Sequence, residues 1–178
     1  MILGEKVYLR LMEEKDVPYK VKWINNPEVR GTLNFDYPIS EVGTRKWLNN
    51  VSGSPNRRDF FVCIKETHKP SGFGGLLNID YKNSKAESYM GIGETGLQGQ
   101  GYGYDIRKLI LKYAFKELSL NKVFAYVWEE NTPMFNLNKK VGFKVEGLLR
   151  DDIFSHGELR NRYIMGILKE EFLSKYGS

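Results

Sequence analysis

The chain has 178 residues, 41% of them hydrophobic, which is enough for one domain with a buried core and leaves little room for two. Its net charge of +5 comes from dispersed basic residues without an aromatic-rich nucleic-acid motif, so a nucleic-acid partner is not expected. No apolar run approaches the ~20 residues of a membrane span and the N-terminus has no signal-peptide core, so we predict a single cytoplasmic domain over residues 1–178 with no membrane partner.

The first half of the chain predicts a strand, two helices and a meander of strands. Residues 7–11 alternate as a strand does, residues 12–25 are typical of a helix that ends before Pro27, and Ser40 is a plausible cap for a helix over 41–51. Three strands are then predicted over 59–66, 72–81 and 86–93. The single cysteine, Cys63, lies in an apolar run and is expected to be a small buried residue in a reducing compartment.

The second half predicts one long helix, an interior strand, a short helix and a closing hairpin. In the helix over 102–118, apolar residues recur on one face, and Arg107, Lys108, Lys112 and Lys116 are assigned to the opposite, polar face. A strand over 122–128 and a helix from Thr132 to Gly142 follow, then a hairpin of 143–154 with 159–168. The fold class predicted is a mixed α/β domain with a mostly antiparallel central sheet, flanking helices and a C-terminal β-hairpin.

Three glycines at alternate positions, Gly99, Gly101 and Gly103, stand directly before the long helix. The segment matches neither the P-loop pattern nor the dinucleotide fingerprint. Glycines before a helix nevertheless expose several N–H groups at the positive end of the helix dipole, where a diphosphate can approach the main chain closely. The alternative is a glycine-rich turn without a ligand.

Three motifs resemble one enzyme family. The segment from Gln98 to Gly103 resembles the Q/R-x-x-G-x-G/A pattern of the GCN5-related N-acetyltransferases, abbreviated GNAT. The segment 128–147 resembles the N-…-K-x-G-F-x-x-E-G stretch of a subgroup that includes ribosomal-protein N-terminal, spermidine and amino-sugar acetyltransferases, and 156–165 resembles a G-x-x-R-N stretch of the spermidine enzymes. The resemblance implies a GNAT-like fold and acetyl-CoA as the co-substrate.

The resemblance also implies where acetyl-CoA would bind. In the family the glycine loop and the next helix hold the pyrophosphate, and the strand over 86–93 splays from the strand over 122–128 to bind the pantetheine arm and the thioester carbonyl. Gly91 and Gly93 would allow close approach of the backbone, unless they form a β-bulge, and Asn131 would contact the arm, unless it is only a helix cap. The implied cofactor-binding residues are Ile92, Gly93, Glu94, Gln98, Gly99, Gln100, Gly101, Tyr102, Gly103 and Asn131.

Acetyl transfer to an amine needs a base for the ammonium proton and compensation for the leaving thiolate. Glu87, which matches a family carboxylate, is the first choice for the base and Glu94 the second; either can also be a plain surface carboxylate. The two positions where the family often carries a hydroxyl donor hold Met134 and Asn138, so no acid is assigned. Tyr89, Tyr126 or a water could serve instead, or the thiolate leaves without a dedicated acid.

The sequence therefore favours an acetyl-CoA-dependent N-acetyltransferase. A non-catalytic acyl-CoA-binding module of the same fold is the alternative. The acceptor is expected to be a small-molecule or peptidyl amine, with no choice made between a peptide N-terminus, an amino sugar and a polyamine, and a homodimer is left open. No metal site is expected, because the two histidines, His68 and His156, both fall in predicted turns.

Overall fold

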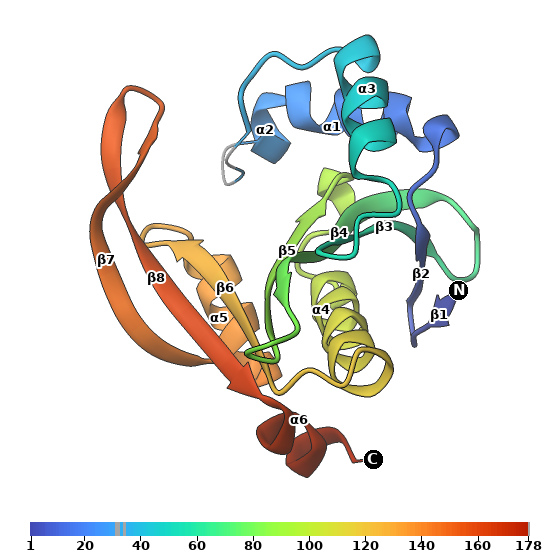
Figure 1. The fold of residues 1–178 in the computed structure, drawn as a ribbon. Helices are drawn as coiled ribbons and strands as arrows, with labels where there is room; N and C mark the ends of the chain where they lie inside the picture. Colours follow the sequence, from blue (N-terminus) through green and yellow to red (C-terminus); the bar gives the residue numbers. More distant parts are fainter. Residues whose placement is uncertain (31–32, 34, 178) are drawn as a thin grey trace.

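Residues 1–30, 33 and 35–177 are described by the computed structural model, and their strands form one eight-stranded sheet (Figure 1). The strand order is β1-β2-β3-β4-β5-β6-β8-β7, and the β5–β6 pair is parallel while the other neighbours are antiparallel. The predicted mixed, mostly antiparallel sheet is therefore confirmed. The strands are β1 (Ile2–Leu3), β2 (Val7–Leu11), β3 (Arg58–Ile64), β4 (Pro70–Asp80), β5 (Lys85–Ile92), β6 (Lys122–Trp128), β7 (Lys144–Ser155) and β8 (Glu158–Leu168).

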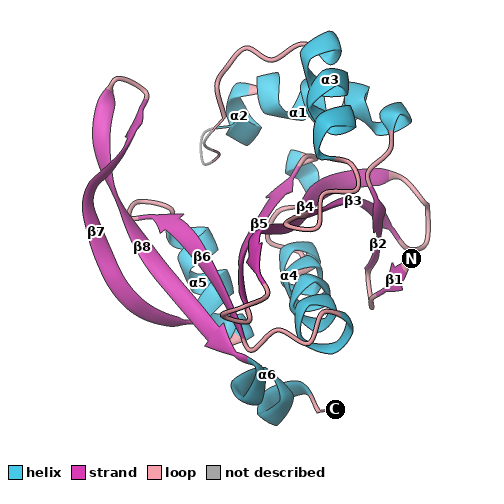
Figure 2. Ribbon diagram, in the orientation of Figure 1, coloured by secondary structure: helices cyan, strands magenta, loops and turns pink. Residues whose placement is uncertain are grey.

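The helices cover the two faces of this sheet (Figure 2). Helices α1, α2 and α3 pack on the face that carries Phe61 and Phe73. Helix α4 packs on the face that carries Phe60 and Val62. Neighbouring residues of β3 thus enter opposite cores, as the period of two in a strand requires. The helices are α1 (Val17–Asn25), α2 (Pro27–Arg30), α3 (Glu41–Val51), α4 (Tyr102–Lys112), α5 (Thr132–Val141) and α6 (Lys169–Tyr176).

Neighbouring strands β5 and β6 separate along their length. Their parallel register starts at Lys85 with Lys122 and ends at Glu87 with Phe124. Beyond that point β5 continues to pair with β4 as far as Ile92, while β6 pairs with β8 as far as Trp128. The edge of β5 that faces β6 therefore has no strand partner after Glu87, as the resemblance implied.

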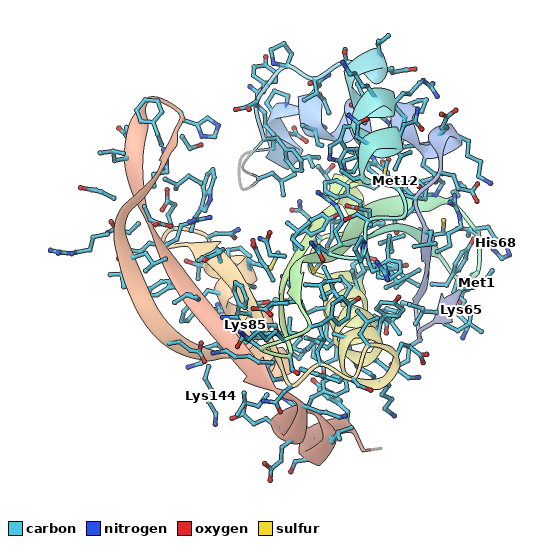
Figure 3. All side chains as sticks on the ribbon, viewed as in Figure 1. Met1, Met12, Lys65, His68, Lys85 and Lys144 are labelled. Carbon is cyan, nitrogen blue, oxygen red and sulfur yellow. The ribbon has the colours of Figure 1, made fainter. Side chains whose placement is uncertain are left out.

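Several local predictions are confirmed. The Ser40 hydroxyl accepts the N–H of Gly43 at 3.0 Å and caps α3. Cys63 is buried on the α1 side of the sheet. The two histidines are exposed turn residues with positive φ, and Figure 3 places His68 at the outer edge of the sheet, in the β3–β4 turn.

The sequence did not predict β1, α2 or α6, and the long helix is less regular than expected. After Lys112 the helix widens into a π-helical turn, Tyr113–Glu117. More important for the site, the assignment of Arg107 to a polar face is wrong, because its side chain is 2% exposed. Within the described residues, no helix is both long and apolar enough to cross a membrane, and no cluster of three potential metal ligands occurs.

Candidate active site

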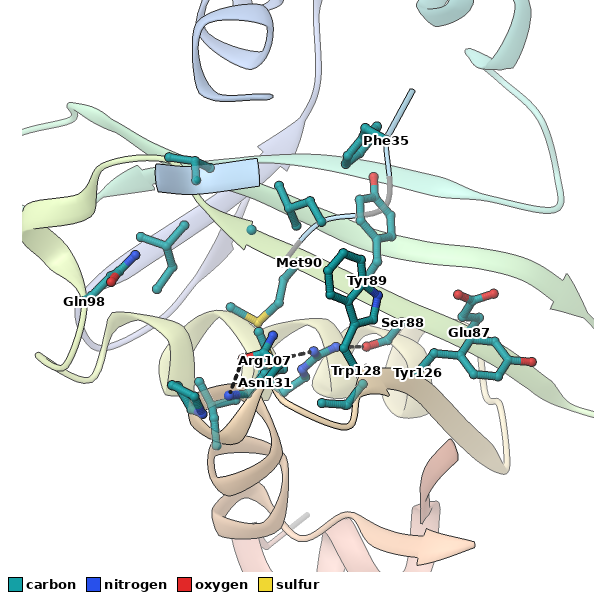
Figure 4. Close-up of a pocket in the computed structure, with 18 of the residues that line it drawn as sticks. Phe35, Glu87, Ser88, Tyr89, Met90, Gln98, Arg107, Tyr126, Trp128 and Asn131 are labelled. Carbon is teal, nitrogen blue, oxygen red and sulfur yellow. Dashed lines mark hydrogen bonds between the residues drawn. The ribbon is translucent and has the colours of Figure 1, made fainter. Parts of the chain in front are cut away.

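A cleft of about 900 Å³ opens where β5 and β6 separate (Figure 4). Residues of β5, β6, α4 and α5 line it, together with residues from α1, α2 and α3. Its lining includes aromatic side chains from four parts of the fold, among them Phe35, Trp47, Tyr89, Tyr126 and Trp128. The charged residues of the described lining are five cations and two carboxylates: Lys20, Arg57, Arg107, Lys140, Arg162, Glu28 and Glu87.

The glycine loop borders one end of this cleft through Gln98 and Gly99. Gly99 and Gly101 have φ of +74° and +85°, in the left-handed region that favours glycine. A Cβ added at Gly99 would meet no atom within 4 Å, so the space beside the loop is open. Because α4 starts at Tyr102, its first N–H groups have no partner within the helix. The loop and helix end thus fit a phosphate-bearing group.

The other residues of the loop segment have packing roles. A Cβ on Gly103 would lie 2.8 Å from a methyl group of Leu137, so glycine there permits close contact between α4 and α5. The Gln100 amide donates to the Gly96 carbonyl at 2.6 Å. The Tyr102 ring lies under the Lys6 ammonium, 5.3 Å from its centroid. None of Gln100, Gly101, Tyr102 and Gly103 is among the described residues that line the cleft.

Residues at the end of β5 and just after it face either the cleft or the α1 side of the sheet. Gly91 and Ile92 line the cleft. At Gly93, however, a Cβ would lie 2.1 Å from the indole ring of Trp23, so glycine is required there for the packing of α1. Glu94 accepts the indole N–H of Trp23 at 2.9 Å and lies outside the described cleft lining. This position gives Glu94 less support than Glu87 as a base.

Glu87 is a half-buried carboxylate in the cleft, at the last residue of the β5–β6 register. Its oxygen accepts the side-chain N–H of Asn78 at 3.0 Å. Burial raises the pKa of Glu87, and the Asn78 hydrogen bond and the Arg162 charge oppose this in part. A carboxylate with these surroundings is a stronger base than an exposed one.

Asn131 is a helix cap that also lines the cleft. Its side-chain oxygen accepts the N–H of Met134 at 3.2 Å and so caps α5. The same residue lines the cleft. The cap fixes the side chain at the point where β6 ends and α5 begins.

Of the two tyrosines considered as an acid, Tyr89 has its hydroxyl bound to a carboxylate, and Tyr126 has its ring against a guanidinium. The O–H of Tyr89 donates to the Asp59 carboxylate, and burial together with Asp59 holds the pKa of Tyr89 well above its usual range. In Figure 4 this hydroxyl points toward Phe35 and away from Arg107. The Tyr126 ring packs against the Arg162 guanidinium, 4.2 Å from its centroid.

Sequence reasoning missed two buried cations in the cleft, Lys20 and Arg107. The Lys20 ammonium lies 3.7 Å from the centroid of the Trp47 ring, and burial lowers its pKa to about 8. Arg107, on α4, donates to the Ser88 hydroxyl and to the Met134 sulfur. A charged residue on a helix with a regular apolar face gives no sequence signal that it points inward.

Comparison with known proteins points to one family. The profile of the acetyltransferase (GNAT) domain matches residues 6–144. The chain is 31% identical to the uncharacterized N-acetyltransferase p20 of Bacillus licheniformis, covering 94% of this chain and 96% of that protein. It is 28% identical to the spermidine N(1)-acetyltransferase of Escherichia coli K12, covering 97% of this chain and 91% of that protein.

A solved structure has a similar fold. The spermidine N-acetyltransferase of Vibrio cholerae, in complex with CoA and spermine, superposes with a TM-score of 0.87. The two chains are 26% identical, and the match covers 94% of this chain and 98% of that one. The likeness therefore extends over the cleft and both core layers.

Proposed function

Because this chain belongs to the GNAT acetyltransferase family and is an acetyl-CoA-dependent N-acetyltransferase, we propose that it acetylates a small primary amine in the cleft between β5 and β6. The observation that carries this proposal is the opening between the two strands. The glycine loop, with open space beside Gly99, lies at one end of it and Glu87 at the other (Figure 4). Acetyl-CoA supplies the acetyl group as an activated thioester.

Different groups of the chain would bind the different parts of acetyl-CoA. The loop from Gln98 to Gly103 and the first N–H groups of α4 would hold the pyrophosphate. Unpaired backbone groups of β5 beyond Glu87, with Asn131, would orient the pantetheine arm and polarise the carbonyl. The Lys140 side chain, on α5 at the cleft, adds positive charge beside this path.

Glu87 would accept the proton that the incoming ammonium must lose before its nitrogen can attack. It is the one carboxylate of the described cleft lining that β5 itself supplies. Its raised pKa increases its strength as a base. A proton transfer through one water fits the same geometry.

The charge of the cleft favours an acceptor with a single amine over a polycation. Five cations against two carboxylates line the described cleft. Arg57 and Arg162 are neutralised by Asp59 and Asp152, but Lys20 and Arg107 have no carboxylate within salt-bridge distance among the described residues. A peptide N-terminus or an amino sugar suits this lining and its aromatic rings. A polyamine is the second candidate, because relatives are spermidine acetyltransferases.

An acceptor screen tests this proposal. The pure protein is incubated with acetyl-CoA and, separately, spermidine, spermine, an amino sugar and a short peptide with a free N-terminus, while free thiol is followed. We expect thiol release to be faster with a singly charged amine than with either polyamine. Faster release with spermidine would reverse the ranking, and binding of acetyl-CoA without release for any amine would favour the non-catalytic module.

Asn138→Tyr is expected to destabilise the protein without accelerating transfer. Asn138 is fully buried, its amide contacts the Met165 sulfur at 3.9 Å, and it is not among the described cleft residues. A tyrosine there would overpack the core, at a cost of about 1–3 kcal/mol. Urea unfolding and kcat measure the two effects.

Asn136→Tyr is the matched control, because Asn136 is exposed, lines the cleft and lies on the same helix. Its free energy of unfolding should change by no more than about 0.5 kcal/mol. A clear gain in kcat for Asn138→Tyr would contradict our view that this enzyme does not need a tyrosine at that position.

The proposal includes a cytoplasmic location. The single cysteine, Cys63, is buried and unpaired, which suits a reducing compartment. Acetyl-CoA as co-substrate suits the same compartment.

A further inference from the structure

Arg107 is a fully buried cation that carries no counter-charge in the described structure. Its side chain is 2% exposed, and Nε has no hydrogen-bond partner. Its neighbours are neutral: the guanidinium donates to the Ser88 hydroxyl and, at 3.5 Å, to the Met134 sulfur, and lies 5.7 Å from the centroid of the Phe143 ring. Burial alone lowers its pKa to about 10, so it stays charged at neutral pH.

Other arginines that line the cleft are arranged differently. Arg57 is held by Asp59 at 2.7 Å, and Arg162 by Asp152 at 2.6 Å. A buried charge without a partner is costly, and replacement by an apolar side chain of similar size usually stabilises a fold. The placement of Arg107 therefore points to an anion that reaches it in the working enzyme.

The position of Arg107 in the cleft narrows the identity of this anion. In Figure 4 Gln98 and Glu87 lie at opposite ends of the drawn cleft, and Arg107 is drawn between them, beside Ser88 on β5. In the proposed function the pyrophosphate binds at the glycine-loop end, and Glu87 accepts the ammonium proton at the other end. The remaining negative charge of the reaction arises between them, on sulfur.

We propose that the Arg107 guanidinium stabilises the thiolate that leaves when acetyl-CoA transfers its acetyl group. This inference rests on the proposed function. Glu87 takes one proton of the ammonium before the attack. The amine nitrogen then forms a bond to the carbonyl carbon, its second proton passes to water, and the electron pair of the broken C–S bond stays on sulfur. The fixed positive charge of Arg107 offsets that electron pair without a proton transfer, and the thiolate takes a proton from water after release. A dedicated tyrosine acid is then unnecessary.

Binding of CoA and of desulfo-CoA, which lacks the thiol, tests this without catalysis. Calorimetry between pH 6 and 9 gives the ratio of the two dissociation constants. A guanidinium beside the sulfur lowers the pKa of the CoA thiol below its value in solution, so as pH rises CoA binding should tighten relative to desulfo-CoA, by up to about tenfold for each unit of lowering. In Arg107→Met the ratio should be independent of pH, and Arg107→Lys should retain part of the dependence.

Lys108→Met is the matched control. Lys108 is the next residue of α4, pairs with Glu5 at 2.8 Å and lies outside the described cleft lining, so removing its charge should leave the pH dependence intact. In kinetics, Arg107→Met should lower kcat by about 10²-fold with little change in KM for acetyl-CoA.

The outcomes separate the two proposals. If neither CoA nor desulfo-CoA binds the wild-type protein, the proposed function fails and this inference fails with it. If both bind with a ratio that does not change with pH, or if Arg107→Met keeps the wild-type dependence, only the role of Arg107 is overturned. If Arg107→Met does not fold, a wild-type ratio that stays constant with pH still overturns the role of Arg107, and Arg107→Lys still tests it.

Discussion

Glu87→Gln is expected to lower kcat/KM for the amine by about 10²–10⁴-fold, the usual contribution of a general base, while acetyl-CoA affinity stays nearly unchanged. Glutamine keeps the size of the side chain, and its oxygen can still accept the Asn78 N–H that Glu87 accepts at 3.0 Å. The variant therefore removes the proton acceptor and leaves the local packing in place. Steady-state rates and acetyl-CoA titration measure the two quantities.

The pH profile gives a second signature of Glu87. Burial raises its pKa, so wild-type kcat/KM should rise with pH through a value above the ordinary range of a glutamate, as the carboxyl loses its proton. In Glu87→Gln this rise should be absent. A raised folded pKa also means that the stability linked to this group is present at low pH and is lost as pH rises through the folded value. The variant should thus not be less stable than wild type at neutral pH.

Glu94→Gln is the control for this prediction. The Glu94 carboxylate accepts from Trp23 outside the described cleft lining, so its loss should leave the pH profile unchanged. If Glu87→Gln retains the wild-type rate and profile while Glu94→Gln loses both, the base has been assigned to the wrong carboxylate.

The sequence predicted the parts of the fold that have a clear period. The strands of the meander carry residues such as Phe60 and Phe61 that alternate between two cores, and this alternation is visible in the letters. β1, with two residues, and α2, with four, are too short to show a period. α6 follows β8 directly and has eight residues, of which Phe172, Leu173 and Tyr176 pack against the core, too few to show a helical period.

The sequence predicted the site only where local chemistry is visible. The glycine loop and Glu87 could be selected as candidates from the sequence, because their residue types are unusual or match a motif. The glycines themselves were harder to interpret, since Gly93 and Gly103 are needed for contact with Trp23 and Leu137, which come from distant segments. The burial of Arg107 likewise depends on contacts with β5 and α5. The helical period of α4 does not reveal these contacts.

Gly101→Val is expected to weaken acetyl-CoA binding by about 10²-fold, which corresponds to about 2.7 kcal/mol. Gly101 is the residue directly before α4, with φ of +85°, a conformation that a β-branched residue adopts only with strain. The strain is relieved if the loop moves, and the N–H groups of the loop and of the helix end then no longer converge on one phosphate. A loss of one or two charge-assisted hydrogen bonds, each worth about 1.5–3 kcal/mol, accounts for the expected effect.

Gly53→Val separates this effect from backbone strain alone. Gly53 has φ of +79°, nothing within 4 Å of an added Cβ, and a place in the loop after α3, outside the described cleft lining. Both variants should therefore lose a similar free energy of unfolding, about 1–3 kcal/mol. Only Gly101→Val should lose affinity, because Gly101 directly precedes the first N–H groups of α4, which we propose hold the diphosphate, whereas Gly53 follows α3. Equal acetyl-CoA affinities in the two folded variants would mean that the loop does not bind the pyrophosphate.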